Sequence, residues 1–103
     1  MSSLVTYANR TFTFTGKLTI YKVSELKNKI LEGYNGEATK AGDFFLDLSA
    51  VETVDAAVLQ LLISFKNMLV KAQGNLKLKA SAQTFDSLLD LFGMPADTFP
   101  KGK

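Results

Sequence analysis

The stretch from residue 43 to residue 62, DFFLDLSAVETVDAAVLQLL, constrains the fold more than any other part of the sequence. It starts with a short apolar run at residues 44–48, which has the length and composition of a buried strand. Residues 50–54 predict a five-residue connection, and Asp55 stands directly before a long run with helical periodicity. Asp is a strong N-cap residue because its carboxylate accepts free N–H groups of the first helical turn. Junctions of this kind, between a buried strand and a helix, are where open α/β domains commonly place functional groups.

The segment before this stretch predicts two strands and a helix. Residues 4–8 form a short first strand, and residues 11–15 alternate Thr and Phe strictly, which is typical of a half-buried strand. A first helix is expected from residue 23, with Ser24 as its N-cap, Tyr34 on its apolar face, and Gly33 and Asn35-Gly36 as its stop.

The segment after Asp55 predicts two helices and one strand. The long helix is expected to span about residues 55–73. Residues 76–80 alternate leucine and lysine, which suits an exposed or edge strand. The last helix is expected at about residues 82–92, with Ser81 as its cap. Four of its residues fall at core spacing: Phe85, Leu88, Leu89 and Phe92.

This order of elements predicts an α/β fold with a small mixed, mostly parallel sheet covered by three helices. Strand–helix–strand units imply parallel pairing, and the first strand is expected to be antiparallel. The 103 residues make a single domain, with a tail from about residue 94 that we expect to be only partly ordered.

Composition excludes several classes of function. The chain has no cysteine and no histidine, which removes disulfides, thiol nucleophiles, the usual zinc sites and histidine-based triads. Its ten acids are spread along the sequence, so we expect no enzyme activity, cofactor or metal site. A formal charge of +2 is too small to indicate a nucleic-acid partner. Without a signal pattern or a long apolar run, we expect a cytoplasmic protein with no direct membrane insertion.

A motif in the central stretch resembles the signature of STAS domains, the family of the anti-sigma factor antagonists and of the cytoplasmic tails of sulfate transporters. It consists of Asp47-Leu48-Ser49-x-Val51-x-x-Val54-Asp55-x-x-x-Leu59. Supporting matches are GKLTIY at residues 16–21 and FGM at residues 92–94, and the resemblance covers about residues 4–95. Within the family, the chain is also weakly similar to SypA-like regulators of bacterial polysaccharide or biofilm loci.

The resemblance implies a phosphorylation switch whose acceptor is missing. In antagonist-type members, a serine or threonine directly follows the aspartate of the motif and is phosphorylated by a partner kinase. Here Ala56 stands at that phosphoacceptor position and Ala57 follows it, so the chain resembles a permanently unphosphorylated state. Two explanations stay open: a natural member that binds without a switch, or an engineered Ser→Ala replacement.

The function that the resemblance implies is a non-enzymatic bacterial signal-transduction domain. It would bind an anti-sigma-type serine kinase, or the cognate phosphatase regulator, through the connection and the start of the long helix. The expected partner-binding residues are Ser49, Thr53, Val54, Asp55, Ala56, Ala57, Leu59, Gln60 and Ile63. The alternative is a STAS subunit of an ABC transporter complex in lipid trafficking that binds its ATPase. The ending LFGMPAD at residues 91–97 is similar to such subunits, although these typically keep a threonine after the aspartate.

Three residue-level alternatives also stay open. Leu59, Ile63 and Val70 form either an exposed binding strip or a flank buried under a neighbouring helix. Ser49 and Thr53 are either further phosphate acceptors or local hydrogen-bonding groups. Binding of a nucleotide ranks low because the chain has no glycine-rich phosphate loop.

Overall fold

The computed structural model describes residues 4–37, 41–94 and 98–100. Within these residues the elements follow the order β1 (Val5–Ala8), β2 (Thr11–Leu18), the 3-10 turn η1 (Ile20–Lys22), α1 (Val23–Asn35), β3 (Gly42–Val54), α2 (Ala56–Lys71), β4 (Gly74–Ala80) and α3 (Gln83–Leu91). This arrangement confirms the α/β fold that the sequence predicts.

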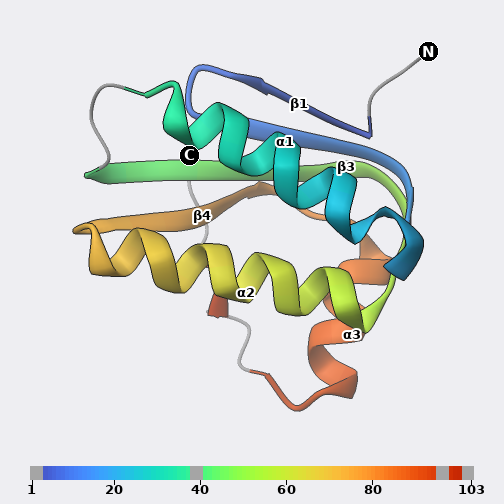
Figure 1. Ribbon diagram of the computed structural model, residues 1–103. Helices are drawn as coiled ribbons and strands as arrows, with labels where there is room; N and C mark the ends of the chain where they lie inside the picture. Colours follow the sequence, from blue (N-terminus) through green and yellow to red (C-terminus); the bar gives the residue numbers. More distant parts are fainter. Residues whose placement is uncertain (1–3, 38–40, 95–97, 101–103) are drawn as a thin grey trace.

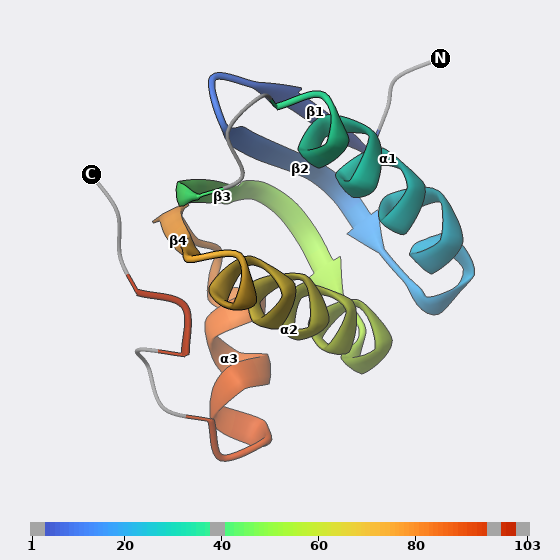
Figure 2. The ribbon, with the colours of Figure 1, turned by 60° about the vertical axis from the view of Figure 1, so that its left-hand side comes forward.

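The four strands form one sheet in the order β1-β2-β3-β4. β1 pairs antiparallel with β2 through a two-residue turn in which Asn9 and Arg10 both have positive φ (51° and 61°), as such tight hairpins require. β2, β3 and β4 pair in parallel. Helices α1 and α2 cover one face of the sheet, and α3 lies on the other side (Figures 1 and 2).

An aromatic cluster fills the space between the sheet and helices α1 and α2. Phe12 and Phe44 lie on neighbouring strands and are fully buried. The Phe65 ring of α2 meets the Phe12 ring edge-on, with centroids 5.4 Å apart. Tyr34 of α1 completes the cluster. Its ring centroid lies 5.6 Å from that of Phe44 and 5.8 Å from that of Phe65. Edge-on and tilted contacts of this kind are the geometry that aromatic pairs favour, so the cluster holds both helices on the sheet.

β3 is longer than the sequence pattern predicts. The predicted connection at residues 50–54 is wrong, because the strand continues to Val54 and pairs there with the end of β2. Between its contacts with Thr13 and Thr15, β3 advances from Asp47 to Ala50, so it carries one extra residue. A bulge of this kind breaks the period-two alternation that marks a strand in a sequence. The continuous strand therefore delivers Asp55 in a fixed position.

Two helix starts differ from the prediction. α1 begins at Val23, directly after η1, so Ser24 lies inside the first turn and Lys22 occupies the N-cap position. α3 is preceded by Ala82 at its N-cap, and the hydroxyl of Ser81 donates to Asp86 within the helix at 2.7 Å. Neither serine is therefore an N-cap.

Gly33 lies inside α1 and does not end it, since the helix continues to Asn35. A Cβ atom at Gly33 would lie 2.8 Å from Cγ of Tyr7 and 2.9 Å from Cε1 of Phe12. Packing against these two rings requires glycine at this position. Gly33, which the sequence suggests as a helix breaker, instead allows α1 to pack closely against the sheet.

β4 forms the sheet edge opposite β1, and several groups protect it. Lys79 is exposed, and the Nζ atom of Lys77 lies 3.0 Å from Oδ2 of Asp43. The backbone N–H of Leu78 donates to the carbonyl oxygen of Pro100 at 2.7 Å. The predicted edge position of this strand is confirmed.

Phe99 belongs to the hydrophobic core, which the sequence pattern did not indicate. It is fully buried, and its ring centroid lies 5.7 Å from that of Phe85 in α3. Residues 95–97 and 101–103 of the predicted part-ordered tail lie outside the described residues. The described part of the tail is packed against the domain.

Candidate functional site

Asp55 connects three elements at the point where β3 ends and α2 begins. Its backbone N–H donates to the carbonyl of Leu18 at the end of β2 (2.9 Å), and its carbonyl accepts the N–H groups of Val58 and Leu59 (3.0 and 3.1 Å). Its carboxylate accepts the N–H of Ile20 in η1 at 2.9 Å. Asp55 occupies the N-cap position as predicted, but its side chain makes no capping hydrogen bond to α2. The carboxylate stabilises the neighbouring turn instead.

The first turn of α2 carries only small side chains at its start. Ala56 and Ala57 begin the helix and are half-buried. Position 56, where the resemblance to STAS domains predicts a phosphoacceptor, therefore has no hydroxyl that could form a phosphate ester. Thr53 is the closest hydroxyl residue in the sequence, and it is exposed.

A small hollow of about 170 Å³ opens beside Ala56, between the first two turns of α2 and the end of α3. It is lined by Ala56, Leu59, Gln60, Ile63, Phe92 and Met94. The structure thus brings Ala56, Gln60 and Ile63 together on one surface, as the prediction of a partner-binding face requires.

A second hollow, of about 490 Å³, lies between the end of β3 and α3. Thr53 and Val54 form its β3 side, and Leu88 and Leu91 are among the α3 residues that line it. Val54 and Ala56, the two sequence neighbours of Asp55, therefore each line a depression of the surface.

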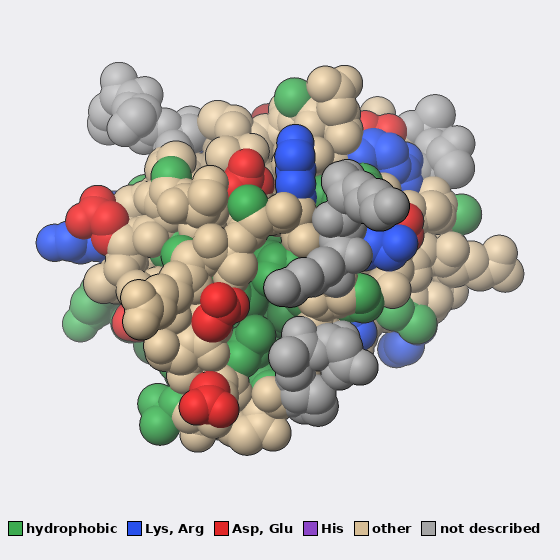
Figure 3. Space-filling view, turned by 180° about the vertical axis from the view of Figure 1, so that it is seen from behind, with side chains coloured by type: hydrophobic (Ala, Val, Ile, Leu, Met, Phe, Trp, Pro, Cys, Tyr) green, Lys and Arg blue, Asp and Glu red, His purple; other side chains and the backbone are tan. Residues whose placement is uncertain are grey.

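Large apolar side chains are exposed around this junction, and the sequence pattern did not predict their exposure. They are Ile20 (58% exposed) and Tyr21 (92%) in η1, and Leu91 (78%) and Phe92 (53%) at the end of α3. Figure 3 shows hydrophobic side chains gathered in the middle of the face that lies away from α1 and α2, with acidic side chains beside them. The available signal was the pair of large apolar residues directly before Gly93, because a residue at a helix end has few neighbours to cover it.

One core assignment is wrong, and the structure decides between the two alternatives left open for Leu59 and Ile63. Phe92 is not a core residue, since α3 ends at Leu91 and Phe92 lies beyond the last turn. Of the two alternatives for Leu59, Ile63 and Val70, the buried flank fits Leu59, which is only 3% exposed, and largely fits Ile63, which is half-buried. Val70 is exposed, but it lies at the far end of α2 from Ala56.

Ser49 is separated from the junction. Five residues of extended strand lie between Ser49 and Asp55, so the two positions are about 20 Å apart. Its hydroxyl and its backbone N–H both donate to Oδ1 of Asp47, at 2.7 and 3.0 Å. These hydrogen bonds lower the pKa of the Asp47 carboxyl, with a further contribution from the positive charge of Lys79. The geometry fits the local hydrogen-bonding role that was one of the two alternatives for Ser49.

A family model described as "Mlab, STAS domain" matches residues 8–96. That range includes the β3–α2 junction, both hollows and all of α3. The chain belongs to the STAS domain family. The narrower similarity to SypA-like regulators stays a prediction.

Three solved structures have the fold of this STAS domain. An anti-sigma factor antagonist from Mycobacterium paratuberculosis is 22% identical, with a TM-score of 0.74 over 97% of this chain and 83% of that chain. A putative anti-sigma factor antagonist from Thermotoga maritima is 17% identical, with a TM-score of 0.71 over 94% of this chain and 81% of that chain. The anti-sigma factor antagonist SpoIIAA in its unphosphorylated form is 14% identical, with a TM-score of 0.72 over 96% and 86%. A search of curated protein sequences found no match.

Two further properties bear on what the STAS domain can do. In the described part of the chain, no group of three or more acidic side chains is arranged to hold a metal ion. None of the described helices is long and apolar enough to cross a membrane.

Proposed function

We propose that this STAS domain is a non-enzymatic regulatory domain that binds a partner protein through the β3–α2 junction. The partner is an anti-sigma-type serine kinase or its cognate phosphatase regulator. One observation carries the proposal: of the five large hydrophobic side chains exposed among the described residues, four lie in η1 and at the end of α3, on the two elements that adjoin the junction. Exposed apolar groups gathered in one place are typical of interaction surfaces.

The small side chain of Ala56 also favours this surface as the binding site. It lines a hollow with Ile63 and Phe92, so a partner side chain can approach the helix start closely. A phosphate at this position would add a charge of about −1.5 to −2 and would disfavour an apolar contact. Ala56 therefore keeps the surface in its binding state, whatever the activity of a kinase.

Replacement of Ala56 by Glu tests the proposal without threatening the fold. A negative charge in the first turn of a helix is stabilising by about 0.3–1 kcal/mol, and the hollow beside Ala56 leaves room for the longer side chain. We expect Ala56→Glu to retain the thermal stability of the unaltered domain and to lose its partner. Bait proteins immobilised at equal density, with retained kinases and regulators quantified by mass spectrometry, measure the loss.

The matched control is Val70→Glu, which places the same charge on an exposed apolar residue of the same helix. Val70 lies fourteen residues further along α2, about 21 Å away along the helix axis. We expect Val70→Glu to retain the partner. Equal retention of the kinase or regulator by Ala56→Glu and the unaltered domain would remove the docking site from the junction.

A second variant, Ala56→Ser, asks whether a kinase still recognises the junction. With ATP and lysate of the source cell, we expect the intact mass of Ala56→Ser to increase by one phosphate, and the mass of the unaltered domain to stay the same. A phosphate on neither protein argues against a kinase partner, and a phosphate on the unaltered domain points to Thr53 or Ser49.

A second candidate function is that of a STAS subunit that binds the ATPase of an ABC transporter in lipid trafficking. The description of the matching family model names Mlab and no anti-sigma factor antagonist. This description supports the transporter subunit as a second candidate. The same exposed surface would serve, because exposed apolar side chains are typical of interaction sites for protein partners in general. Copurification with an ATPase instead of a serine kinase distinguishes the two.

A further inference from the structure

The outer edge of β1 presents backbone groups toward the open side of the sheet. The N–H of Thr15 donates to the carbonyl of Leu4 at 2.9 Å, which makes this a hydrogen-bonded pair between the two strands. Hydrogen-bonded and non-hydrogen-bonded pairs alternate along an antiparallel ladder. The register of β1 on β2 therefore directs the N–H and C=O groups of Val5 and Tyr7 away from β2. Two donors and two acceptors face outward at the spacing of an extended strand.

The two edges of the sheet are protected very differently. β4 carries two lysines and is paired at Leu78 by the carbonyl of Pro100. β1 has the sequence VTYA, with no charged residue and no proline, and its pairing with β2 has no register shift. Natural edge strands usually carry charges, proline, a bulge or a covering segment, because a bare edge pairs with other chains. Among the described residues, β1 has none of these four features on its own strand.

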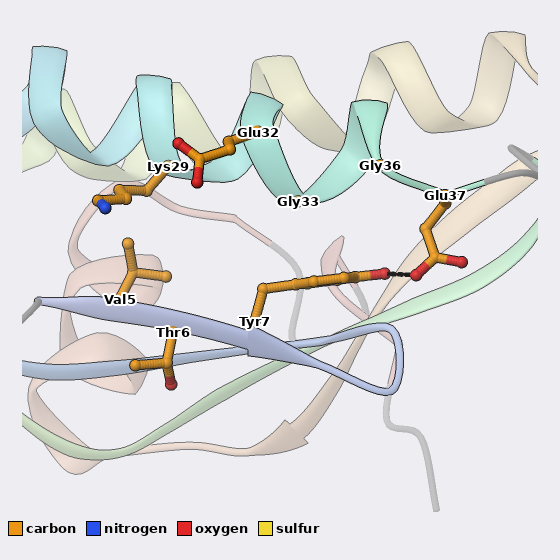
Figure 4. A pocket seen from close by; sticks show the side chains of 8 residues that line it. All are labelled: Val5, Thr6, Tyr7, Lys29, Glu32, Gly33, Gly36 and Glu37. Atoms are coloured by element: carbon orange, nitrogen blue, oxygen red, sulfur yellow. Dashed lines mark hydrogen bonds between the residues drawn. The ribbon is translucent and has the colours of Figure 1, made fainter.

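A groove of about 460 Å³ runs beside this bare edge, between β1 and α1 (Figure 4). Val5, Thr6 and Tyr7 form its strand side, and Lys29, Glu32, Gly33, Gly36 and Glu37 form its helix side. In Figure 4 the side chain of Val5 points up toward α1, Thr6 points to the other face, and Tyr7 extends along the groove to its hydrogen bond with Glu37. The strand edge and the helix thus line a groove that runs alongside β1.

Gly36 keeps the helix side of this groove open, although the fold does not require glycine there. Its φ is −74°, which suits any residue, and a Cβ atom would meet only backbone oxygens of α1 at 3.5 and 3.6 Å. This differs from Gly33, where the rings of Tyr7 and Phe12 exclude a side chain. A larger residue at position 36 would fill the groove without disturbing the core.

We propose that the β1 edge and the groove under α1 form a binding site for an extended peptide segment of a partner protein, which adds to the sheet as a fifth strand next to β1. The backbone groups of Val5 and Tyr7 supply the hydrogen bonds, as in other domains that bind peptides at a sheet edge. Antiparallel addition is expected, because it is slightly more stable per residue than parallel addition.

The groove itself excludes a second copy of this chain as the occupant. A β1 strand from a second copy would present Val5 and Tyr7 on the groove side, but both side chains are already packed beneath their own α1, where Val5 is only 4% exposed. Such a strand would bring no side chain to fill the groove. A flexible segment has side chains free on both faces, so every second one can enter the groove beside Gly36.

The chemistry of the groove indicates the kind of peptide. The helix side of the groove carries the carboxylates of Glu32 and Glu37 as well as Gly36 and the aliphatic stem of Lys29, so apolar side chains suit the positions next to Gly36 and the Lys29 stem. Side chains on the other face lie beside Thr6 and are exposed to solvent. The expected ligand is therefore an extended segment in which apolar and polar residues alternate.

Amide hydrogen exchange measured by NMR tests this site directly. The probes are short, acetylated and amidated peptides that alternate threonine with valine, leucine or phenylalanine. In the free domain, we expect fast exchange at Val5 and Tyr7 and slower exchange at Thr6 and Ala8, which bond to β2. With a probe at up to about 1 mM, a concentration that detects weak binding, Val5 and Tyr7 should become protected. The slowing should be at least about tenfold, since exchange then requires the peptide to leave.

Two controls separate strand addition from unspecific binding. The first is the same peptide with N-methyl groups at alternate residues, which keeps its side chains but cannot donate along the pairing edge. The second is a pair of variants, Gly36→Leu and Asn35→Leu, which add the same side chain at neighbouring positions; only Gly36 lines the groove. We expect the N-methylated peptide and Gly36→Leu to abolish the protection, and Asn35→Leu to retain it.

Several results would overturn the proposal. Protection of Val5 and Tyr7 in the free, dilute domain would mean that the edge is not open, and protection that grows with domain concentration would make a second copy the occupant. No protection by any of the probes at the highest concentration would also reject the site. None of these results bears on the function proposed for the junction, since the groove shares no residue with either hollow there.

Discussion

Phe44 and Phe92 have the same side chain in opposite surroundings. Phe44 is fully buried under α1 and α2, where the rings of Tyr34 and Phe65 have their centroids within 6.4 Å of its own. Phe92 is 53% exposed at the end of α3, beside Ala56. Burial of a phenylalanine side chain contributes about 1.5–3 kcal/mol to folding, so exposure of Phe92 leaves part of that free energy for binding. The covered face of this STAS domain stabilises the fold, and the junction end offers apolar surface to a partner.

The largest effect is expected where the covered face is broken. Phe44→Ala removes the ring at the centre of the aromatic cluster and also the surface on which the Arg10 guanidinium lies, 4.1 Å from the ring centroid. A Phe→Ala change at a fully buried site lowers the free energy of unfolding by about 3–5 kcal/mol. Urea denaturation followed by circular dichroism measures the loss. A decrease below about 1 kcal/mol would mean that the cluster relaxes around the cavity, and would contradict this account of the core.

The covered face could be predicted from the sequence, because its pattern is local. The alternation of Thr11 to Thr15 and the helical spacing around Phe65 each place one side of an element against a core, and both predictions are confirmed. The end of β3 could not be predicted, because its bulge moves Val51 out of phase with Leu48. A bulge depends on how the neighbouring strand pairs, and nothing near residues 48–51 in the sequence indicates that partner.

Asp55 connects the end of the sheet with the junction, and a change there should have an intermediate effect on stability. Asp55→Ala leaves the N–H of Ile20 without its acceptor and loosens η1 from the junction. We expect the free energy of unfolding to fall by about 1.5–3 kcal/mol, the usual contribution of a hydrogen bond to a charged group. The same denaturation experiment measures it.

Asp55→Asn is the matched control, because its amide keeps an oxygen that can accept the same hydrogen bond. We expect it to recover more than half of the stability that Asp55→Ala loses. If Asn and Ala were equally destabilising, the negative charge of Asp55 would matter more than the hydrogen bond to Ile20.

The junction shows why half of a site can be predicted from a sequence and half cannot. The position of Asp55 between a strand and a helix is a local pattern, and so is the pair of alanines that follows it. The partner of its carboxylate lies 35 residues away in the sequence, and no local pattern indicates it. Likewise, Phe92 has core spacing in the sequence but is exposed, because α3 ends one residue before it. Exposure at a helix end depends on which other elements reach it.

The smallest effect on stability is expected at Phe92, and this variant separates the two regions most clearly. Phe92→Ser removes an exposed ring, so the free energy of unfolding should change by no more than about 0.5 kcal/mol. Its partner affinity should fall about fivefold or more, because aromatic anchors at the centre of an interface contribute more than about 1 kcal/mol each. Val70→Ser is the matched control, since Val70 is 52% exposed but lies at the other end of α2. Both variants should unfold like the unaltered domain, and only Phe92→Ser should bind weakly. Equal partner affinity of the two variants would mean that exposed apolar surface has the same role everywhere on the domain, and the contrast between Phe44 and Phe92 would then reflect packing alone.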